Sequence, residues 1–473
     1  MFAKRARDWT AFIALAMVFI IPIETRSQEL ARTDSAATAG SAARKGEVKA
    51  DAKTDTRTDA KVDNAELLRI VTALEERVKE LEAKLASASA GTPSGNPREA
   101  AGASPSPVQG ADVAELKKEL DSLKEEQKKN NGFLGFFRDV EVSGLVDGYY
   151  SYNFNRPDAG VNNARAFDAY DNSFSLNLAK ITLEKKNDLA NPLGFKVDLG
   201  FGPTVDIVNG PGPYGGQQIK NLLQAYLSYV APIGNGLTVD FGKFATPAGA
   251  EVIETKDNYN YSRGLLFTYG PYYHLGFRSK YTFNDKVAVT GFLLNGWDIH
   301  TDNNHGKTYG ASVTLTPTSR LAITQTYLGG PEQVGDSRQW RNFSDTVLSY
   351  VATDKLTFLA NFDYGTDKLI SGQKGHWTAF AAYMKYAFNN RFAFSPRFEI
   401  FDDHDGFRTG LPQSIKEFTL TQEVKLVNNL ITRFEFRRDW SDANFFNKSV
   451  GELVRSQNTL LIGLMYSFSS RGQ

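Results

Sequence analysis

Hydrophobic and polar residues alternate one by one along most of the chain, from about residue 139 to residue 468. In the first such segment, Val146, Tyr150 and Phe154 fall on even positions, whereas Asp147 and Ser151 fall on odd positions. A repeat of two residues is typical of a β-strand with one apolar face and one polar face. We count about sixteen segments of this kind, each roughly 8–14 residues long, which predicts an all-β fold for this region.

The links between these segments are alternately short and long. Short links lie at residues 232–236, 284–286, 317–320, 353–355, 389–391 and 427–429. Longer polar links lie at residues 156–172, 203–220, 244–272, 298–307, 329–340, 366–376, 403–414 and 441–455. Short turns at one end and long loops at the other are typical of outer-membrane β-barrels, so eight long loops predict a transmembrane antiparallel β-barrel of about sixteen strands. A large secreted β-protein with an apolar core is the alternative.

Aromatic residues crowd the ends of the predicted strands. Two aromatic girdles, one at each membrane surface, are expected of such a barrel. We assign to them Tyr149, Tyr150, Tyr152, Trp297, Tyr386, Phe388 and Trp440.

The N-terminal region has a different character. Lys4, Arg5 and Arg7 precede an apolar run at about residues 9–23, and small residues follow it. This order predicts a secretory signal peptide over residues 1–27, with an uncleaved anchor helix as the alternative. Residues 28–63 contain few apolar side chains and are predicted to be a disordered tether.

Apolar residues spaced alternately by four and three precede the barrel in two places. They predict a coiled coil over residues 64–86 and a second short helix or coiled coil over residues 111–130, separated by a linker rich in Pro, Ala and Ser at residues 87–110. We expect the coiled coil to be a periplasmic stalk that joins copies of the chain, and a helix packed on its own chain is the alternative. The barrel is predicted to occupy residues 138–473. The heptad positions are Leu67, Val71, Leu74, Val78, Leu81, Leu85, Val113, Leu116, Leu120 and Leu123.

Composition excludes several classes of function. The 54 Lys and Arg residues balance the 54 Asp and Glu residues, so net charge gives no reason to expect a nucleic-acid partner. A mean hydropathy of −0.36 is too low for a bundle of membrane helices. The chain has no cysteine, which excludes disulfides, thiolate metal sites and cysteine nucleophiles. We predict no enzyme activity, no metal site and no cofactor.

Several short motifs carry a resemblance to a known family. They are Ser-Gly-Leu-Val-Asp-Gly-Tyr-Tyr-Ser-Tyr-Asn-Phe-Asn at 143–155, Asn-Ser-Phe-Ser-Leu-Asn at 172–177, Asp-Phe-Gly-Lys-Phe-Ala-Thr-Pro at 240–247, Asn-Tyr-Asn-Tyr-Ser-Arg at 258–263, Asn-Gly-Trp at 295–297, Phe-Asp-Asp-His-Asp-Gly-Phe at 401–407 and Tyr-Ser-Phe at 466–468. Through them the chain resembles the beta-barrel porin-2 family of Gram-negative outer-membrane proteins. The resemblance implies a passive diffusion channel and names no solute.

A barrel of about sixteen strands is wide enough to hold an aqueous channel lined by the polar strand faces. The longest link, residues 244–272, carries Glu251, Glu254, Asp257 and Arg263. By resemblance to general porins, whose third external loop enters the lumen, we predict that this link is the pore constriction loop, and a loop over the outer rim is the alternative. The predicted pore-lining wall consists of Arg278, Lys280, Arg397, Glu399, Arg433, Glu435 and Arg437.

The sequence is compatible with two arrangements of these charges. An acidic loop facing a basic wall would set up a transverse field, whereas pairing across neighbouring strands would only keep the lumen wet. Because the two signs nearly balance, we expect weak ion selectivity.

The expected function is an outer-membrane porin for passive diffusion of small hydrophilic solutes. Its expected partners are outer-membrane lipid, these solutes and further copies of the chain, in a trimer by resemblance to porins generally, with peptidoglycan as a candidate partner of the stalk. A sugar-preferring channel with lumen aromatics and a plugged barrel that tethers the outer membrane to the cell wall are the alternatives.

Overall fold

The computed structural model describes residues 139–210, 219–369 and 371–471, and eleven helical positions between residues 76 and 125. Those positions are 76, 77, 79, 80, 83, 118, 120–122, 124 and 125, and they belong to a unit separate from the barrel. The predicted signal peptide, tether and linker, and every heptad position except Leu120, lie outside the described residues. No helix in the described ranges is long and apolar enough to cross a bilayer.

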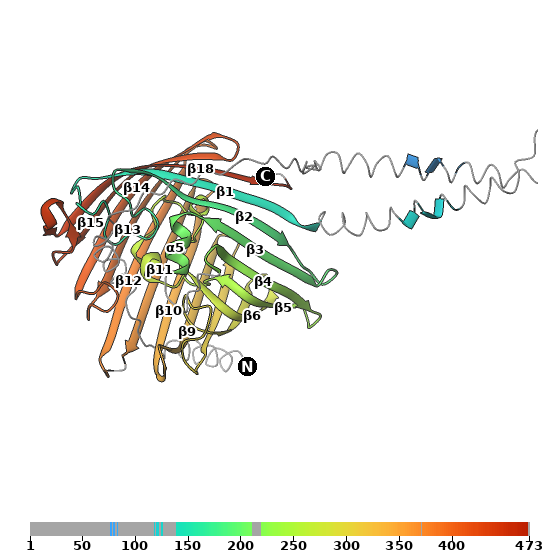
Figure 1. The fold of residues 1–473 in the computed structure, drawn as a ribbon, viewed down its shortest axis with the longest axis horizontal. Helices are drawn as coiled ribbons and strands as arrows, with labels where there is room; N and C mark the ends of the chain where they lie inside the picture. The colour runs from blue at the N-terminus through green and yellow to red at the C-terminus, as the bar shows by residue number, and fades with distance from the viewer. Residues whose placement is uncertain are drawn as a thin grey trace, which may run out of the picture. The chain divides into compact units, whose positions relative to one another are not determined.

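Sixteen antiparallel strands close into one barrel (Figure 1). They are β1 (Glu141–Asn153), β2 (Ser173–Lys185), β3 (Leu193–Phe201), β4 (Leu222–Ala231), β5 (Leu237–Ala245), β6 (Tyr273–Asn284), β7 (Val287–Leu294), β8 (Thr308–Thr318), β9 (Leu321–Gln333), β10 (Asp336–Thr353), β11 (Leu356–Lys368), β12 (Lys374–Ala387), β13 (Phe392–Asp403), β14 (Gln413–Val427), β15 (Leu430–Ser441) and β18 (Ser456–Ser469). The predicted fold class and strand number are confirmed.

Neighbouring barrel strands follow chain order with one interruption. Between β15 and β18, β16 (Phe446–Asn447) and β17 (Leu453–Val454) form a separate hairpin in the last long loop. The barrel closes where β1 pairs with β18, with Gly144 opposite Phe468 and Tyr150 opposite Ile462. Every strand edge is therefore paired, as a lipid environment requires.

The two faces of the barrel wall have opposite chemistry. Outward side chains are apolar and exposed, such as Phe174 at 89% and Leu227 at 67%. Inward side chains are polar and buried, such as Asp147, Asp198 and Glu399, each at 0%. A water-soluble protein has the opposite distribution, with polar side chains outside and apolar side chains inside. The distribution seen here fits a barrel wall with lipid on its outer face.

Two of the aromatic assignments are wrong. Tyr149 is only 4% exposed and packs against Tyr261, with ring centroids 5.7 Å apart. Trp297 is 5% exposed and packs against Phe343 at 5.1 Å. Tyr149 faces inward because a strand turns successive side chains to opposite faces. Trp297 lies in the loop that follows β7, where its ring packs into the buried aromatic cluster.

The connections follow the predicted alternation of short turns and long loops, with two corrections. The links predicted at 329–340 and 366–376 are mostly strand, so that only residues 334–335 and 369–373 lie between the paired strands. Gly335, with φ of 73°, permits the tighter of these turns. We attribute the difference to composition: these links are rich in polar and small residues and lack the apolar alternation of the other strands, although residues 329–333 are buried in the structure. A seventh short turn, residues 186–192, was not predicted.

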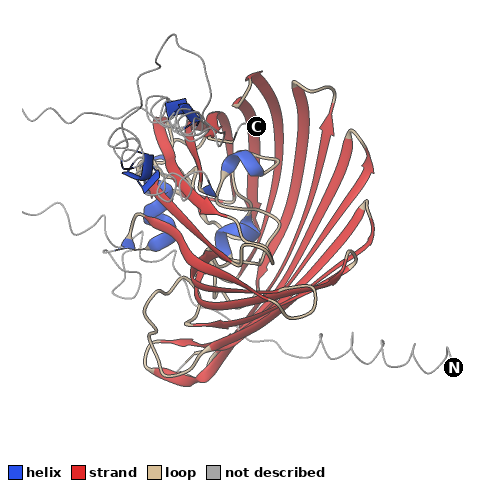
Figure 2. Ribbon diagram, turned by 90° about the vertical axis from the view of Figure 1, so that its right-hand side faces the viewer, coloured by secondary structure: helices blue, strands red, loops and turns tan. Residues whose placement is uncertain are grey.

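The helices of the barrel region are short and lie in the long loops (Figure 2). The second long loop contains α5 (Pro203–Asn209), and the last contains η3 (Ser449–Gly451). The third contains η2 (Thr255–Asp257) and α6 (Leu265–Tyr269).

Candidate functional site: a loop held inside the barrel

The third long loop, residues 246–272, lies within the barrel, and we call it the lumen loop. A hydrogen bond of 3.0 Å from the Thr246 amide to the Tyr272 carbonyl closes its base. At its centre, Asn260, Tyr261 and Ser262 are 0% exposed. A loop lying over the outer rim would be exposed to water on one side, so this degree of burial requires walls on all sides.

On one side the loop contacts β1 and β2. The Tyr261 hydroxyl donates to Asp147 at 2.6 Å, and the Thr255 hydroxyl donates to the same carboxylate. Glu254 forms an ion pair with Lys180 of β2. Burial, reinforced by the Asp147 carboxylate, raises the pKa of the Tyr261 hydroxyl well above its usual value. That hydroxyl therefore stays protonated and remains a hydrogen-bond donor.

Two strands along the wall from β1, Arg433 of β15 binds the backbone of the loop. Its guanidinium donates to the carbonyls of Thr255, Asn258 and Asn260 at 2.7, 2.6 and 2.8 Å. It also pairs with Glu423 at 2.7 Å, and it is 0% exposed. All of these acceptors are satisfied by one planar group with several donors, which is a property of arginine.

Two more wall arginines bind the loop backbone in the same way. Arg397 of β13 donates to the Ser262 carbonyl at 2.6 Å, and Arg437 of β15 donates to the Arg263 carbonyl at 2.6 Å. Glu417 lies between the two guanidinium groups, at 2.9 Å from Arg397 and 3.2 Å from Arg437. The shared carboxylate offsets the repulsion between the two buried cations.

Two wall glutamates accept hydrogen bonds from loop amides. Glu435 accepts from Tyr261 at 2.8 Å and from Ser262 at 3.1 Å. Glu399 accepts from the Leu265 amide at the start of α6, and Gly264 lies so close that a Cβ there would collide with the Glu399 carboxylate. A residue with no side chain is needed at this approach.

The four charges predicted on the loop have different environments. Glu251 is buried, pairs with Arg397 at 2.7 Å and accepts from the Gly264 amide at 2.6 Å. Glu254 is partly exposed and bound to Lys180, as described above, whereas the Asp257 side chain is 50% exposed.

Arg263 holds the loop together from within. Its guanidinium donates to the carbonyls of Val252, Ile253 and Tyr261, and to the Thr255 hydroxyl. Burial lowers the pKa of Arg263 from its ordinary value, while the carboxylates of Asp147 and Glu251 oppose that effect. The side chain points into the loop, not toward open water.

The structure therefore brings Arg397, Glu399, Arg433, Glu435 and Arg437 together against the loop. Each is at most 3% exposed and is buried where the wall meets the loop. Arg278 and Lys280 lie away from this network, on β6. Arg278 pairs with Asp240 at 2.6 Å and Lys280 is exposed.

The reason for so many buried charges lies in the backbone of the loop. An irregular segment leaves amide and carbonyl groups without the partners that a helix or sheet supplies, and a buried polar group without a partner is costly. Here the wall arginines bind carbonyls and the wall glutamates bind amides. The charged strand faces thus complement the main chain of the loop.

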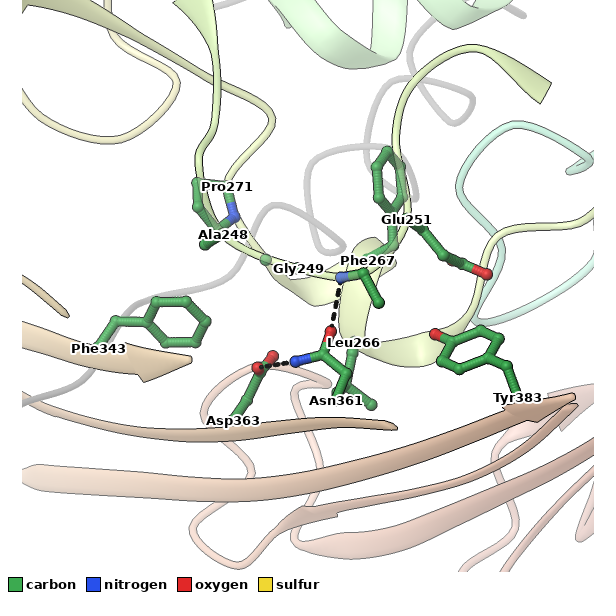
Figure 3. Close-up of a pocket in the computed structure, with 12 residues that line it drawn as sticks. Ala248, Gly249, Glu251, Leu266, Phe267, Pro271, Phe343, Asn361, Asp363 and Tyr383 are labelled. Atoms are coloured by element: carbon green, nitrogen blue, oxygen red, sulfur yellow. Dashed lines mark hydrogen bonds between the residues drawn. The ribbon is translucent and has the colours of Figure 1, made fainter. Parts of the chain in front are cut away.

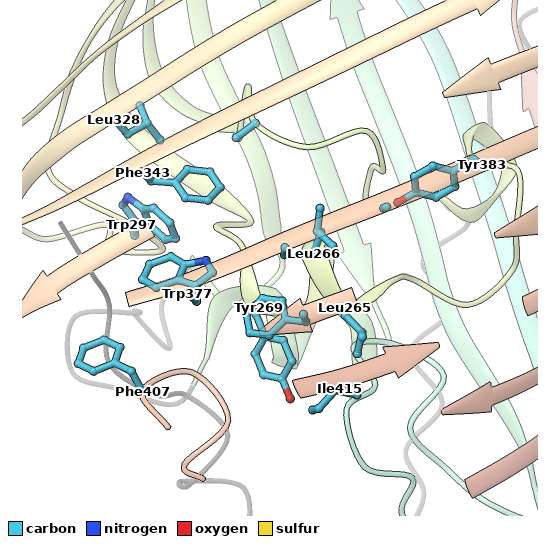
Figure 4. Close-up of a cluster of buried hydrophobic side chains, with 14 of the residues drawn as sticks. Leu265, Leu266, Tyr269, Trp297, Leu328, Phe343, Trp377, Tyr383, Phe407 and Ile415 are labelled. Atoms are coloured by element: carbon cyan, nitrogen blue, oxygen red, sulfur yellow. The ribbon is translucent and has the colours of Figure 1, made fainter. Parts of the chain in front are cut away.

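An apolar cluster holds the helical part of the loop. Leu265, Leu266 and Tyr269 of α6 share a buried cluster with Phe343 and Trp377 (Figure 4). Beside it is a small cavity lined by the loop and by β10–β12 (Figure 3). At its edge, the Ala250 amide donates to Asn361 of β11 at 2.9 Å.

Several residues of the site were not singled out from the sequence. Asp147, Lys180, Asn361 and Glu417 all lie on the polar face of their strands. The alternation identified that face but could not show which of its positions meet the loop.

A closed antiparallel barrel with an apolar outer face, a polar interior and an inward loop defines the class of outer-membrane channel proteins. The chain belongs to the family "Putative beta-barrel porin-2, OmpL-like", whose sequence profile matches residues 139–468. The family and the fold indicate a channel in the outer membrane.

Several solved structures are similar to this chain. An anion-selective porin from Comamonas acidovorans is 12% identical, with coverage of 70% of this chain and 99% of that chain and a TM-score of 0.48. The outer membrane channel DcaP of Acinetobacter baumannii is 13% identical, with coverage of 70% and 97% and a TM-score of 0.47. OmpT of Vibrio cholerae in a trimer form is 13% identical, with coverage of 70% and 99% and a TM-score of 0.47. No curated protein sequence matches the chain significantly.

Proposed function

We propose that this channel lets small hydrophilic solutes diffuse passively through the barrel, with the lumen loop as its constriction. The observation that carries the proposal is the complete burial of residues 260–262 inside the barrel, where they are bound to β1 and β15, two strands of one arc of the wall. A loop held in this way narrows the lumen but does not plug it with a separate folded domain. The proposal includes no catalytic step.

We further propose that the channel is only weakly ion-selective. The loop and wall charges pair locally, as in Glu251 with Arg397 and Glu254 with Lys180. Paired charges of opposite sign leave little net field for a passing ion. This arrangement favours the pairing alternative over a transverse field.

The sugar-preferring alternative has less support. Its stacking path needs aromatic rings exposed to the lumen, but Trp297, Trp377 and Tyr383 are at most 5% exposed and packed in the cluster of α6.

The test is single-channel conductance with the reversal potential in a salt gradient, on the full chain and on a variant in which a short Gly-Ser linker replaces residues 250–265. We expect stepwise conductance and a reversal potential near zero for the full chain, and larger steps for the variant. Equal steps would contradict the constriction role of the loop. A silent but inserted barrel would contradict the open channel and favour the tether.

For the N-terminal region we propose a cleaved signal peptide, a tether and a periplasmic coiled-coil stalk within a homo-oligomer, a trimer by resemblance to porins generally. The heptad spacing supports the stalk. Binding of purified residues 28–130 to peptidoglycan would test whether the stalk also reaches the cell wall.

A further inference from the structure

A second loop contacts α6 of the lumen loop. The loop between β13 and β14, residues 404–412, has two large side chains that are almost fully buried, Phe407 at 5% and Arg408 at 7% exposed. The Arg408 guanidinium donates a hydrogen bond to the carbonyl of Tyr269, the last residue of α6. It also lies over the ring of Trp377, 5.5 Å from the ring centroid. The β13–β14 loop therefore touches the lumen loop itself as well as the barrel wall.

The contact from Arg408 means that both ends of α6 are bound from outside the helix. The first amides and the last carbonyls of a helix have no partner within it, and an arginine side chain can bind the last carbonyls. At the first turn, the Leu265 amide donates to Glu399 of β13. At the last residue, the Tyr269 carbonyl accepts from Arg408. The wall thus holds one end of the helix, and the β13–β14 loop holds the other.

Asp403, the last residue of β13, fixes the conformation of the β13–β14 loop. It is 0% exposed, and its carboxylate accepts from the amides of Phe407, Arg408 and Thr409 at 2.8, 2.7 and 2.6 Å. One carboxylate that binds three consecutive amides holds this turn in a single conformation, and these buried amides would be costly to leave without an acceptor.

The neighbouring phenylalanine adds a packing contact to the same turn. Phe407 belongs to the buried cluster that contains α6 (Figure 4). A Cβ added at Gly375 of β12 would lie 2.6 Å from the Phe407 ring, so the ring occupies the space that this glycine leaves open. The turn is therefore fixed by hydrogen bonds on one side and by packing on the other, and the direction of the Arg408 side chain is fixed with it.

We propose that Arg408 is a positioning residue of the constriction, and that Asp403 positions Arg408. The β13–β14 loop keeps the end of α6 at its place in the lumen, so the width of the channel depends on an outer loop as well as on the barrel wall. This inference rests on the constriction role of the lumen loop in the proposed function and adds a second element that holds that loop.

Thiol labelling measures whether α6 stays in place. The chain has no cysteine, so a single cysteine introduced by Thr268→Cys reports on α6 alone. Thr268 is half-buried, whereas Asp257 on the same lumen loop is exposed and supplies a reference position, Asp257→Cys. The measurement is the rate at which a water-soluble maleimide labels each cysteine in full-length protein in lipid vesicles.

The variant Arg408→Met should release the end of α6. We expect labelling of Thr268→Cys to become about tenfold faster, which corresponds to the loss of one hydrogen bond from a charged group, and labelling of Asp257→Cys to stay unchanged. Arg408→Lys keeps a donor and should restore part of the protection. Asp403→Asn is a second variant that tests the same contact, because an amide has only one oxygen to accept the three hydrogen bonds.

The matched control is Asp405→Asn, which neutralises a carboxylate in the same loop. Asp405 is partly exposed and pairs with His376 at 2.7 Å, away from α6. We expect it to leave both labelling rates at the values of the unmodified background. Faster labelling of Thr268→Cys in this control, to the extent seen in Arg408→Met, would overturn the specific role of Arg408.

Two further results would overturn the proposal. One is an unchanged labelling rate of Thr268→Cys in both Arg408→Met and Asp403→Asn. The other is equal acceleration at both cysteines, which would indicate a loosened barrel and not a displaced helix. Single-channel current of the same variants separates this proposal from the proposed function, because labelling reports the position of α6 whether or not the loop limits the current. Faster labelling with unchanged current would support the role of Arg408 and contradict the constriction.

Discussion

At the scale of single residues, Arg433 shows how one wall side chain can hold several parts of the lumen loop. It serves three loop carbonyls and Glu423 at once. Lysine carries the same charge but lacks the planar set of donors, so it cannot replace these contacts.

Replacing Arg433 should therefore loosen the loop. In Arg433→Met, Glu423 keeps Lys385 but loses its closest partner, and three buried carbonyls lose their donor. We expect a stability loss of about 3–5 kcal/mol, typical of a broken buried pair, and noisier single-channel current. Arg433→Lys should be intermediate.

The matched control is Arg320→Ala, because Arg320 is exposed in a short turn. Unfolding by urea in vesicles and current noise are the two measurements. If Arg433→Met has normal current noise and normal stability, the other wall contacts are sufficient to hold the lumen loop, and the prediction is wrong.

The inward orientation of Arg397, Arg433 and Arg437 was predictable from alternation alone. Their partners were not, since Arg433 binds residues about 175 positions away in the chain. Nothing local in the sequence records which wall residue meets which loop carbonyl, because that depends on how the closed barrel positions both.

At the scale of secondary-structure elements, strands and turns could be predicted because each strand repeats one simple pattern. The strand residues within the links at 329–340 and 366–376 could not be predicted, because polar residues without apolar alternation have the sequence pattern of a loop. Tyr149 was misplaced because position near a strand end does not show which face a side chain occupies. Trp297 was misplaced because it lies in a loop that packs inward.

The outer face of each strand should not tolerate charge. Leu464 is 51% exposed in the apolar row of β18. We expect Leu464→Lys to destabilise the folded barrel by about 2–4 kcal/mol, the cost of a cation near the middle of the bilayer. Urea unfolding in vesicles measures it, with Leu464→Ala as the control for lost apolar area.

At the scale of the whole molecule, the barrel and the N-terminal region separate by composition, and the described structure covers the barrel. The barrel closes on itself through β1 and β18, so its sheet is complete without a strand from the preceding residues.

Deletion of residues 28–130, with the signal peptide kept, should leave single-channel conductance unchanged and reduce the fraction of oligomer. Conductance steps and a native gel would check the two parts. Loss of conductance in an inserted barrel would mean that the N-terminal region takes part in the channel itself.

Many of the contacts between the wall and the lumen loop are made to main-chain carbonyls and amides, which every amino acid except proline supplies in full. Substitutions at loop positions whose side chains face the water would therefore leave most of the attachment intact, as long as Gly264 keeps its close approach to Glu399. Wall residues that bind the main chain in this way allow the loop sequence to diverge while the loop keeps its backbone conformation. Related channels could in this way change which solutes they admit by mutating a few loop side chains, without redesigning the barrel that holds them.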